Sequence, residues 1–173
     1  MLFNSIEFLL FLPIVFVLYW FVVNKNLKAQ NFLILIASYV FYGWWDWRFL
    51  SLIAFSTLVD YWVGIRIQQS EKRVIRRTFL WISMTVNLGL LGFFKYYNFF
   101  VESWRDAWAG LGYEMDPWTL NVILPVGISF YTFQTMSYSI DIYRRNLEPT
   151  KDFIAFAAFV SFFPQLVAGP IER

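Results

Sequence analysis

The distribution of apolar residues constrains this chain more than any other feature. Hydrophobic residues make up 59% of its 173 residues, whereas soluble domains average about 45–50% on a broader definition that includes glycine. Six apolar blocks are separated by short polar stretches, at 1–23, 32–45, 49–65, 79–101, 120–143 and 153–171. A water-soluble chain of this size could not bury so much apolar surface. The sequence therefore predicts an all-α, polytopic bundle of transmembrane helices.

Two of the blocks depart from a simple membrane span. The block at 32–45 is short, since a span needs about 20 residues, and the sequence GWWDWR at 43–48 predicts a tight turn after it. The last block is split by Pro164, Gly169 and Pro170. Pro removes a backbone donor and kinks a helix, so we expect either a short span or a re-entrant segment at this broken late part of the chain.

The basic residues predict an orientation. When the polar stretches are set on alternate sides, one side collects ten Lys and Arg residues and the other collects three, Arg48, Lys95 and Arg105. Cytoplasmic loops carry the excess of positive charge, so the N-terminus is expected outside. The ten are Lys25, Lys28, Arg66, Lys72, Arg73, Arg76, Arg77, Arg144, Arg145 and Lys151.

A polar stripe runs along the fifth block. Gln134, Tyr138, Asp141 and Arg145 follow one another at spacings of four, three and four, which places them on one face of a helix. Polar residues in a span face the bundle interior, because exposure to lipid is costly. The stripe is either the wall of a polar tunnel or a set of hydrogen bonds between helices, with Asp141 and Arg145 at the cytoplasmic interface.

Breaks in the backbone mark the same region. Pro125 and Gly127 precede the stripe, and Pro164 lies beside Gln165 in the last block. Irregular backbone is tolerated in a membrane only where protein or a water-filled cavity covers it. The breaks are therefore plain bends or a re-entrant loop whose freed carbonyls line a cavity together with Gln165.

Other polar residues and two absences limit the chemistry. Asp60 lies deep in the third block and is expected to pair with a partner on another helix. The chain has no histidine and no cysteine, so these residues offer no imidazole base, thiol nucleophile or Cys-based metal site. Asp141 could act as a base, but nothing in its sequence context indicates this role.

Four segments resemble a known family, the bacterial membrane-bound O-acyltransferases, among them the members that O-acetylate alginate. They read YGWWDWRFL at 42–50, LGFFKYYNFF at 91–100, LPVGISFYTFQTMSYSIDIYRR at 124–145 and FFPQLVAGPIER at 162–173. The resemblance runs over residues 1–173. It implies that these residues form the N-terminal part, with about five or six membrane segments, of a single transmembrane domain.

The resemblance also implies a reaction. In this family an acyl group passes from a cytoplasmic donor, expected to be acetyl-CoA and not tightly bound, through a tunnel in the bundle. The acceptor is an exported polysaccharide such as alginate, or a periplasmic partner protein that passes the acetyl group on. The resemblance implies a protein of the bacterial inner membrane, in contact with the bilayer and not with nucleic acid.

The family's catalytic histidine lies on a later segment, so no residue of 1–173 is assigned a catalytic role and these residues are expected to be inactive alone. The residues expected to line the tunnel are Gln134, Tyr138, Asp141, Pro164, Gln165 and Gly169. Two alternatives stay open at this stage. One is a non-enzymatic membrane scaffold or partner subunit of a polysaccharide-modification complex, and the other is a small transporter or channel subunit, suggested by the broken helices alone.

The charge count leads to a prediction about topology. A cysteine introduced at Ser70, between two basic stretches, is expected to stay unlabelled by a membrane-impermeant maleimide in intact cells, because the positive-inside rule places it in the cytoplasm. A cysteine at Ser103 is the control and is expected to react. No native cysteine competes for the label. Labelling at Ser70 with protection at Ser103 would reverse the orientation.

Overall fold

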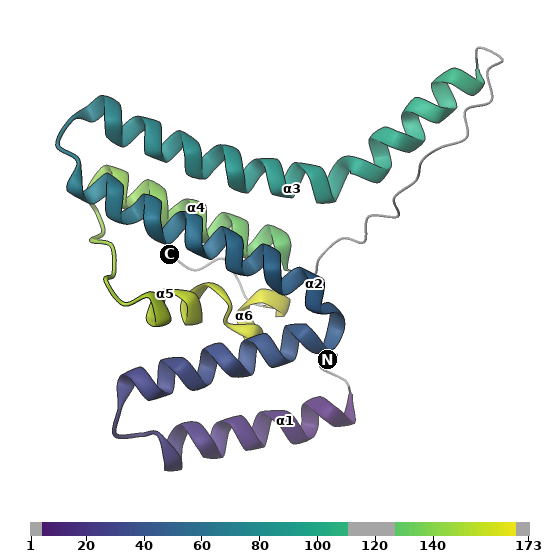
Figure 1. Cartoon of the computed structure of the whole chain (residues 1–173). Helices are drawn as coiled ribbons and strands as arrows, with labels where there is room; N and C mark the ends of the chain where they lie inside the picture. The colour runs from purple at the N-terminus through teal and green to yellow at the C-terminus, as the bar shows by residue number, and fades with distance from the viewer. Residues whose placement is uncertain (1–4, 111–126, 169–173) are drawn as a thin grey trace.

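The computed structural model describes residues 5–110 and 127–168 (Figure 1). In these ranges the chain is helical and contains no strand, as the sequence predicts. The elements are α1 (Ile6–Val17), the π-helical η1 (Leu18–Val22), α2 (Leu27–Gln69), α3 (Arg73–Ala109), α4 (Ile128–Arg144), α5 (Phe153–Val160) and α6 (Phe163–Ala168).

The predicted turn at 43–48 is confirmed as a sharp kink inside α2. Asp46 leaves the helical conformation, with φ −157° and ψ 113°. Its carboxylate accepts the backbone N–H of Arg48 at 2.9 Å and pairs with the Arg48 guanidinium at 2.9 Å. Asp46 thus acts as the N-cap of a new helix. Figure 1 shows that the chain reverses direction here, so α2 is a hairpin of two helices.

α3 is longer than the predicted span at 79–101. Its 37 residues extend for about 55 Å, against about 30 Å for the hydrocarbon layer. Figure 1 shows that its C-terminal part bends away from the bundle. The helical segments long and apolar enough to cross a membrane, within the described ranges, are Asp46–Gln69 and Arg73–Ala109. Ile6–Val22 and Phe153–Leu166 are shorter apolar helical stretches.

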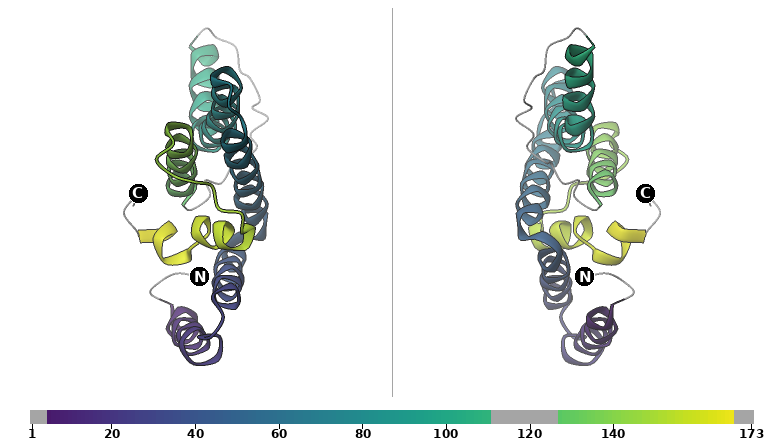
Figure 2. Two further views of the ribbon diagram at one scale, coloured as in Figure 1. Left: turned by 90° about the vertical axis from the view of Figure 1, so that its left-hand side faces the viewer. Right: turned by 90° about the vertical axis from the view of Figure 1, so that its right-hand side faces the viewer.

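The late apolar block is broken, as predicted. α5 contains eight residues, about 12 Å, and α6 contains six, with the break at Ser161 and Phe162. Neither helix is long enough to cross a bilayer. Figure 2 shows α4, α5 and α6 on one side of the α2 hairpin. This arrangement favours the re-entrant alternative over a short span.

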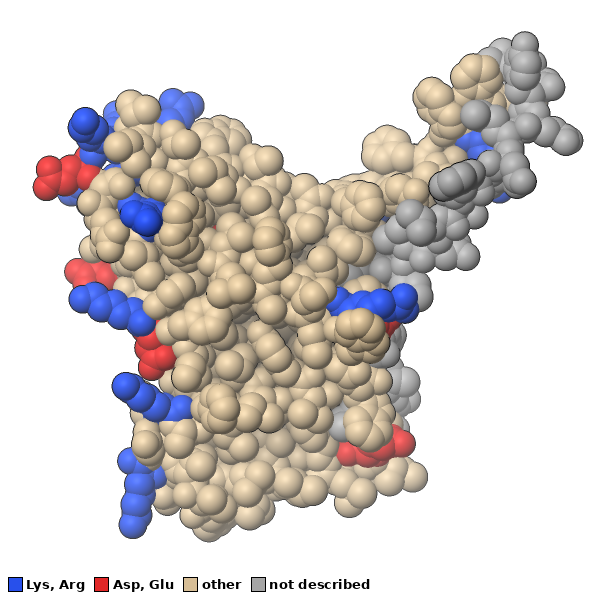
Figure 3. All heavy atoms as spheres, viewed as in Figure 1, with Lys and Arg blue, Asp and Glu red and all other residues tan. Residues whose placement is uncertain are grey.

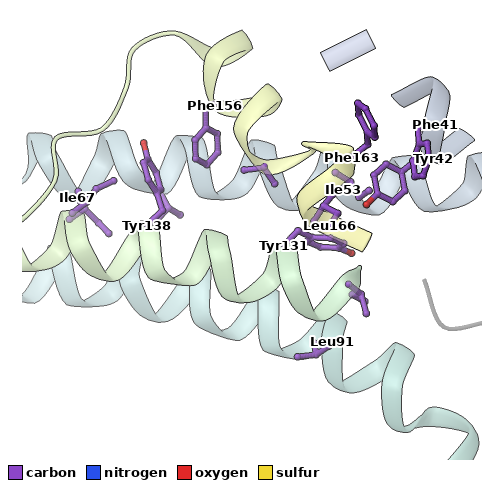
Figure 4. Packing of buried hydrophobic residues seen from close by; sticks show 14 residues of the cluster. Phe41, Tyr42, Ile53, Ile67, Leu91, Tyr131, Tyr138, Phe156, Phe163 and Leu166 are labelled. Carbon is purple, nitrogen blue, oxygen red and sulfur yellow. The ribbon is translucent and has the colours of Figure 1, made fainter. Parts of the chain in front are cut away.

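The core lies where α2, α4, α5 and α6 meet. Figure 4 shows Tyr131, Tyr138, Phe156, Phe163 and Leu166 packed together between these helices. The outer surface is largely apolar, and many large hydrophobic side chains are exposed, as expected of helices that face lipid. Figure 3 shows Lys and Arg gathered at the end of the bundle that holds the α1–α2, α2–α3 and α4–α5 connections.

Gly127 is required where α4 begins, and this gives a prediction. Its φ is +80°, and an added Cβ would lie 2.9 Å from the backbone oxygen of Leu166. A left-handed conformation costs an L-residue about 1–2 kcal/mol, and the contact displaces α6. Gly127→Ala is therefore expected to lower the melting temperature of the purified protein in detergent.

Gly89→Ala is the matched control for this change. A Cβ at Gly89 meets nothing within 4 Å, and Ala is favoured over Gly inside a helix by roughly 1 kcal/mol. The control is expected to leave the melting temperature unchanged or to raise it. Equal melting temperatures for the two variants would contradict the packing at the start of α4.

Candidate functional site

α4 is the element on which the candidate site is built. It packs against α2, α3, α5 and α6, and it carries two polar faces. The predicted stripe, which begins at Gln134, faces α5. A second face, with Thr135 and Ser139, lies against α2 and α3, and both residues are fully buried.

Gln134 satisfies the backbone at the break between α5 and α6. Its side-chain Nε2 donates to the carbonyl oxygen of Phe159 at 3.2 Å. In a continuous helix this carbonyl would accept the N–H of Phe163, but that N–H donates to Ser38 Oγ of α2 at 3.3 Å. Two of the groups that the break frees, the Phe159 carbonyl and the Phe163 N–H, therefore have side-chain partners, as the interior of a membrane protein favours.

The rest of the predicted stripe runs from the buried core to the end of α4. The Tyr138 ring is buried and packs on Phe156, with ring centroids 4.6 Å apart. Asp141 is half-buried and Arg145 is exposed. Arg145 takes a left-handed conformation with φ 64°, and Asn146 N–H closes the helix on the Asp141 carbonyl at 2.9 Å.

Arg76 of α3 also caps this end of α4. Its guanidinium donates to the carbonyl of Ile142 at 3.2 Å and to that of Tyr143. A cation near the last carbonyls complements the negative end of the helix dipole. Asp141 and Arg145, the charged members of the stripe, thus lie at the C-terminal end of α4. This position agrees with the alternative in which they lie at the membrane interface.

α6 holds two of the predicted tunnel residues. Pro164 is half-buried and lines a groove of about 360 Å³, together with residues of α1, η1, α2 and the α5–α6 connection. Apart from Tyr19 the lining is apolar: Leu12, Val15, Phe16, Ile34, Phe162 and Phe163. Gln165, the residue after Pro164, is also half-buried. Gly169, the sixth predicted residue, lies outside the described residues, as do Pro125 and Pro170.

The second face of α4 belongs to a buried polar cluster around Asp60. The Asp60 side chain is fully buried. Its carboxyl group accepts from Ser83 Oγ at 2.5 Å, from Asn87 Nδ2 at 2.8 Å and from Ser139 Oγ at 3.5 Å. The expected partner on another helix is thus found, and it is a set of neutral donors on α3 and α4.

Asn87 extends the cluster to two more hydroxyl groups. Its Oδ1 accepts from Ser56 Oγ at 2.7 Å and from Thr135 Oγ1 at 3.4 Å. Within the described part of the chain Asp60 forms no ion pair. Arg66, one and a half turns away, lies over the Trp62 ring instead, 5.2 Å from its centroid.

Sequence reasoning identified Asp60 but missed the rest of this cluster. A signal was present, because each of the three helices contributes one pair of polar residues at a spacing of four, and that spacing places them on one face. The pairs are Ser56–Asp60 on α2, Ser83–Asn87 on α3 and Thr135–Ser139 on α4. The hydrogen bonds of the cluster run between α2, α3 and α4, so the cluster joins these three helices.

The cluster predicts a stability effect. Hydrogen bonds between membrane helices average about 0.6 kcal/mol, but loss of a shared partner leaves several buried groups unsatisfied, at about 1–3 kcal/mol. Asn87→Leu is expected to lower the unfolding free energy in detergent by an amount in this higher range. Thr85→Val, at an exposed position of α3, is the control and should change it by less than about 0.5 kcal/mol. Similar losses for both would show that the cluster does not join the helices.

Comparison with curated proteins gives matches over the whole chain. It is 45% identical over 176 residues to the probable alginate O-acetylase AlgI of Pseudomonas aeruginosa and 44% identical to that of Pseudomonas putida. It is 34% identical over 198 residues to the peptidoglycan O-acetyltransferase of Helicobacter pylori, with 99% of the chain covered.

The matches cover only part of these relatives. The chain spans 33% of the Pseudomonas aeruginosa protein, 35% of the Pseudomonas putida protein and 37% of the Helicobacter pylori protein. No family model matches the chain, and no solved structure gives a significant match. The predicted resemblance is confirmed in that the curated relatives, at 41–45% identity over the whole chain, are named alginate O-acetylases, and the chain aligns to about a third of their length.

Proposed function

We propose that the protein is a membrane O-acetyltransferase that transfers acetyl groups to an exported polysaccharide such as alginate. The observation that supports this most strongly is the 41–45% identity to alginate O-acetylases over the entire chain. The relatives are about three times as long as the aligned region. Residues 1–173 are therefore proposed to supply the scaffold and part of the acetyl path, with the catalytic base on a later segment.

The proposed path crosses the inner membrane from the cytoplasm to the periplasm. Acetyl-CoA is the proposed donor, reached at the basic end of the bundle that Figure 3 shows. Under the positive-inside rule this end is cytoplasmic and the N-terminus is periplasmic. The kink at Asp46 and the start of α4 then lie at the periplasmic end, where a polysaccharide or a periplasmic acetyltransferase partner would receive the acetyl group.

The tunnel wall is proposed to include the predicted stripe and α6. Gln134 and Tyr138 are buried at the contact between α4 and α5, and Pro164 and Gln165 form part of the short helix that follows the break. The two short helices α5 and α6 pack on α4, and the proposed path runs along this contact. Asp141, at the basic end, would mark the entrance, and Gly169 follows α6 in the sequence.

Acetyl transfer tests the proposal directly. The protein as its host produces it, purified in detergent, is expected to release CoA from acetyl-CoA only when an alginate oligosaccharide or the partner protein is present. Residues 1–173 alone are expected to release none, because they contain no imidazole to act as general base. In the complete protein, Gln165→Leu should reduce transfer by 10²-fold or more if it disturbs the acetyl path.

The same acetyl-transfer assay provides a control variant and the results that would contradict the proposal. Ser137→Leu, on the neighbouring side of α4, is expected to retain most activity at equal protein level. Normal transfer by Gln165→Leu would remove this residue from the wall. Absence of transfer by the complete protein with every acceptor would favour the non-enzymatic scaffold.

A further inference from the structure

Three buried tyrosines of the core, Tyr42, Tyr131 and Tyr138, have hydroxyl groups with no hydrogen-bond partner among the described residues, and the first two lie near the start of α4. Tyr42 of α2 is 6% exposed and Tyr131 of α4 is 1% exposed. Within residues 5–110 and 127–168 neither phenol oxygen has a hydrogen-bond partner, and both atoms are inaccessible to solvent. Most buried polar side-chain atoms in proteins are hydrogen-bonded. Two unpartnered phenols near the start of α4 therefore require an explanation.

The two hydroxyls lie together at the start of α4. Tyr42 Oη is 3.3 Å from the position that a Cβ on Gly127, the residue before α4, would occupy. Figure 4 shows both rings beside Leu166, with their oxygens directed toward the same space. Gly127 has no side chain to cap α4. The first backbone N–H groups of this helix are therefore further hydrogen-bond donors close to the Tyr42 hydroxyl.

The surroundings restrict what could bind there. The neighbouring members of the core are apolar, including Phe41, Ile128 and Leu166. Phenol hydroxyls between apolar side chains suit a small uncharged group with one acceptor oxygen, such as the end of a larger ligand. A carboxylate would need a cation to offset the cost of its burial, and a sugar ring would need more hydrogen-bonding groups than two phenols supply.

We propose that the Tyr42 and Tyr131 hydroxyls bind the carbonyl oxygen of an acetyl group on its way through the protein. This inference rests on the proposed O-acetyltransferase function and adds a binding site to it. The site lies at the end of the bundle where the acetyl group would leave. The two hydroxyls have no partner in the unliganded protein because the ligand is to be their partner. Active sites commonly keep such unfavourable buried groups because function requires them.

Four single variants of the natively expressed protein test the site. Tyr42→Phe and Tyr131→Phe each remove one unpartnered hydroxyl and keep the ring. Tyr61→Phe is the matched control for a partnered hydroxyl, since Tyr61 Oη donates to the Lys151 carbonyl at 2.7 Å. Tyr96→Phe is the control for an exposed tyrosine, because the Tyr96 side chain is 47% exposed.

Stability and turnover together distinguish the outcomes. Tyr42→Phe and Tyr131→Phe are expected to leave the melting temperature unchanged or raised, and each is expected to lower kcat/KM for acetyl transfer about threefold to tenfold, as loss of one neutral hydrogen bond would. Tyr61→Phe is expected to lower the melting temperature with little change in kcat/KM, and Tyr96→Phe to change neither. A lowered melting temperature for Tyr42→Phe or Tyr131→Phe would mean that protein satisfies these hydroxyls, and would overturn the proposal.

The bound carbonyl is observed by isotope-edited infrared spectroscopy. One arm uses [1-¹³C]acetyl-CoA, and the other uses an alginate oligosaccharide O-acetylated with [1-¹³C]acetate, so that the donor and the acetylated product are tested separately. In at least one arm the labelled carbonyl band of the bound ligand should move to higher frequency when either hydroxyl is removed. No shift in either arm, with an active wild-type protein, overturns the site alone. An inactive wild-type protein would instead overturn the proposed function.

Discussion

The structure depends on the satisfaction of polar groups that no water can reach. The break between α5 and α6 shows this most clearly, because it frees the Phe159 carbonyl and the Phe163 N–H in the interior. Gln134 and Ser38 supply the missing partners from α4 and α2. An unsatisfied backbone group in a membrane costs several kcal/mol, so both side chains stabilise the broken segment. The irregular backbone and the two helices that cover it therefore form one unit.

α4 connects this unit to the remainder of the bundle. Gln134 faces the break, while Thr135, the next residue, faces Asn87 and the Asp60 cluster. A helix turns about 100° per residue, so neighbouring positions reach different partners. Arg76 and the left-handed Arg145 fix the end of the same helix, and Gly127 fixes its start against Leu166. Both ends and both faces of α4 are therefore in contact with neighbouring helices.

The sequence predicted the features that depend on local chemistry. The apolar blocks, the turn at Asp46 and the break around Pro164 follow from composition, a short polar interruption and the missing N–H of proline. The stripe from Gln134 to Arg145 was placed on one face, but its role as a tunnel wall stays a prediction. The meeting of Ser56–Asp60 with Ser83–Asn87 and Thr135–Ser139 was not foreseen. Spacing shows that each pair shares a face, but the depth at which three helices align depends on packing between residues far apart in the chain.

The interior contains two polar features with different roles, the Asp60 cluster and the hydroxyls of Tyr42 and Tyr131. Asp60 carries the more reactive group, yet its carboxyl group is fully engaged by Ser83, Asn87 and Ser139. A group with every partner supplied by protein has little left to offer a ligand, so the cluster serves to join helices. The hydroxyls of Tyr42 and Tyr131 are chemically milder but unengaged. Since burial of such donors is unfavourable in the absence of a partner, these hydroxyls, unlike the Asp60 carboxyl group, keep the capacity to bind a polar atom from outside the chain.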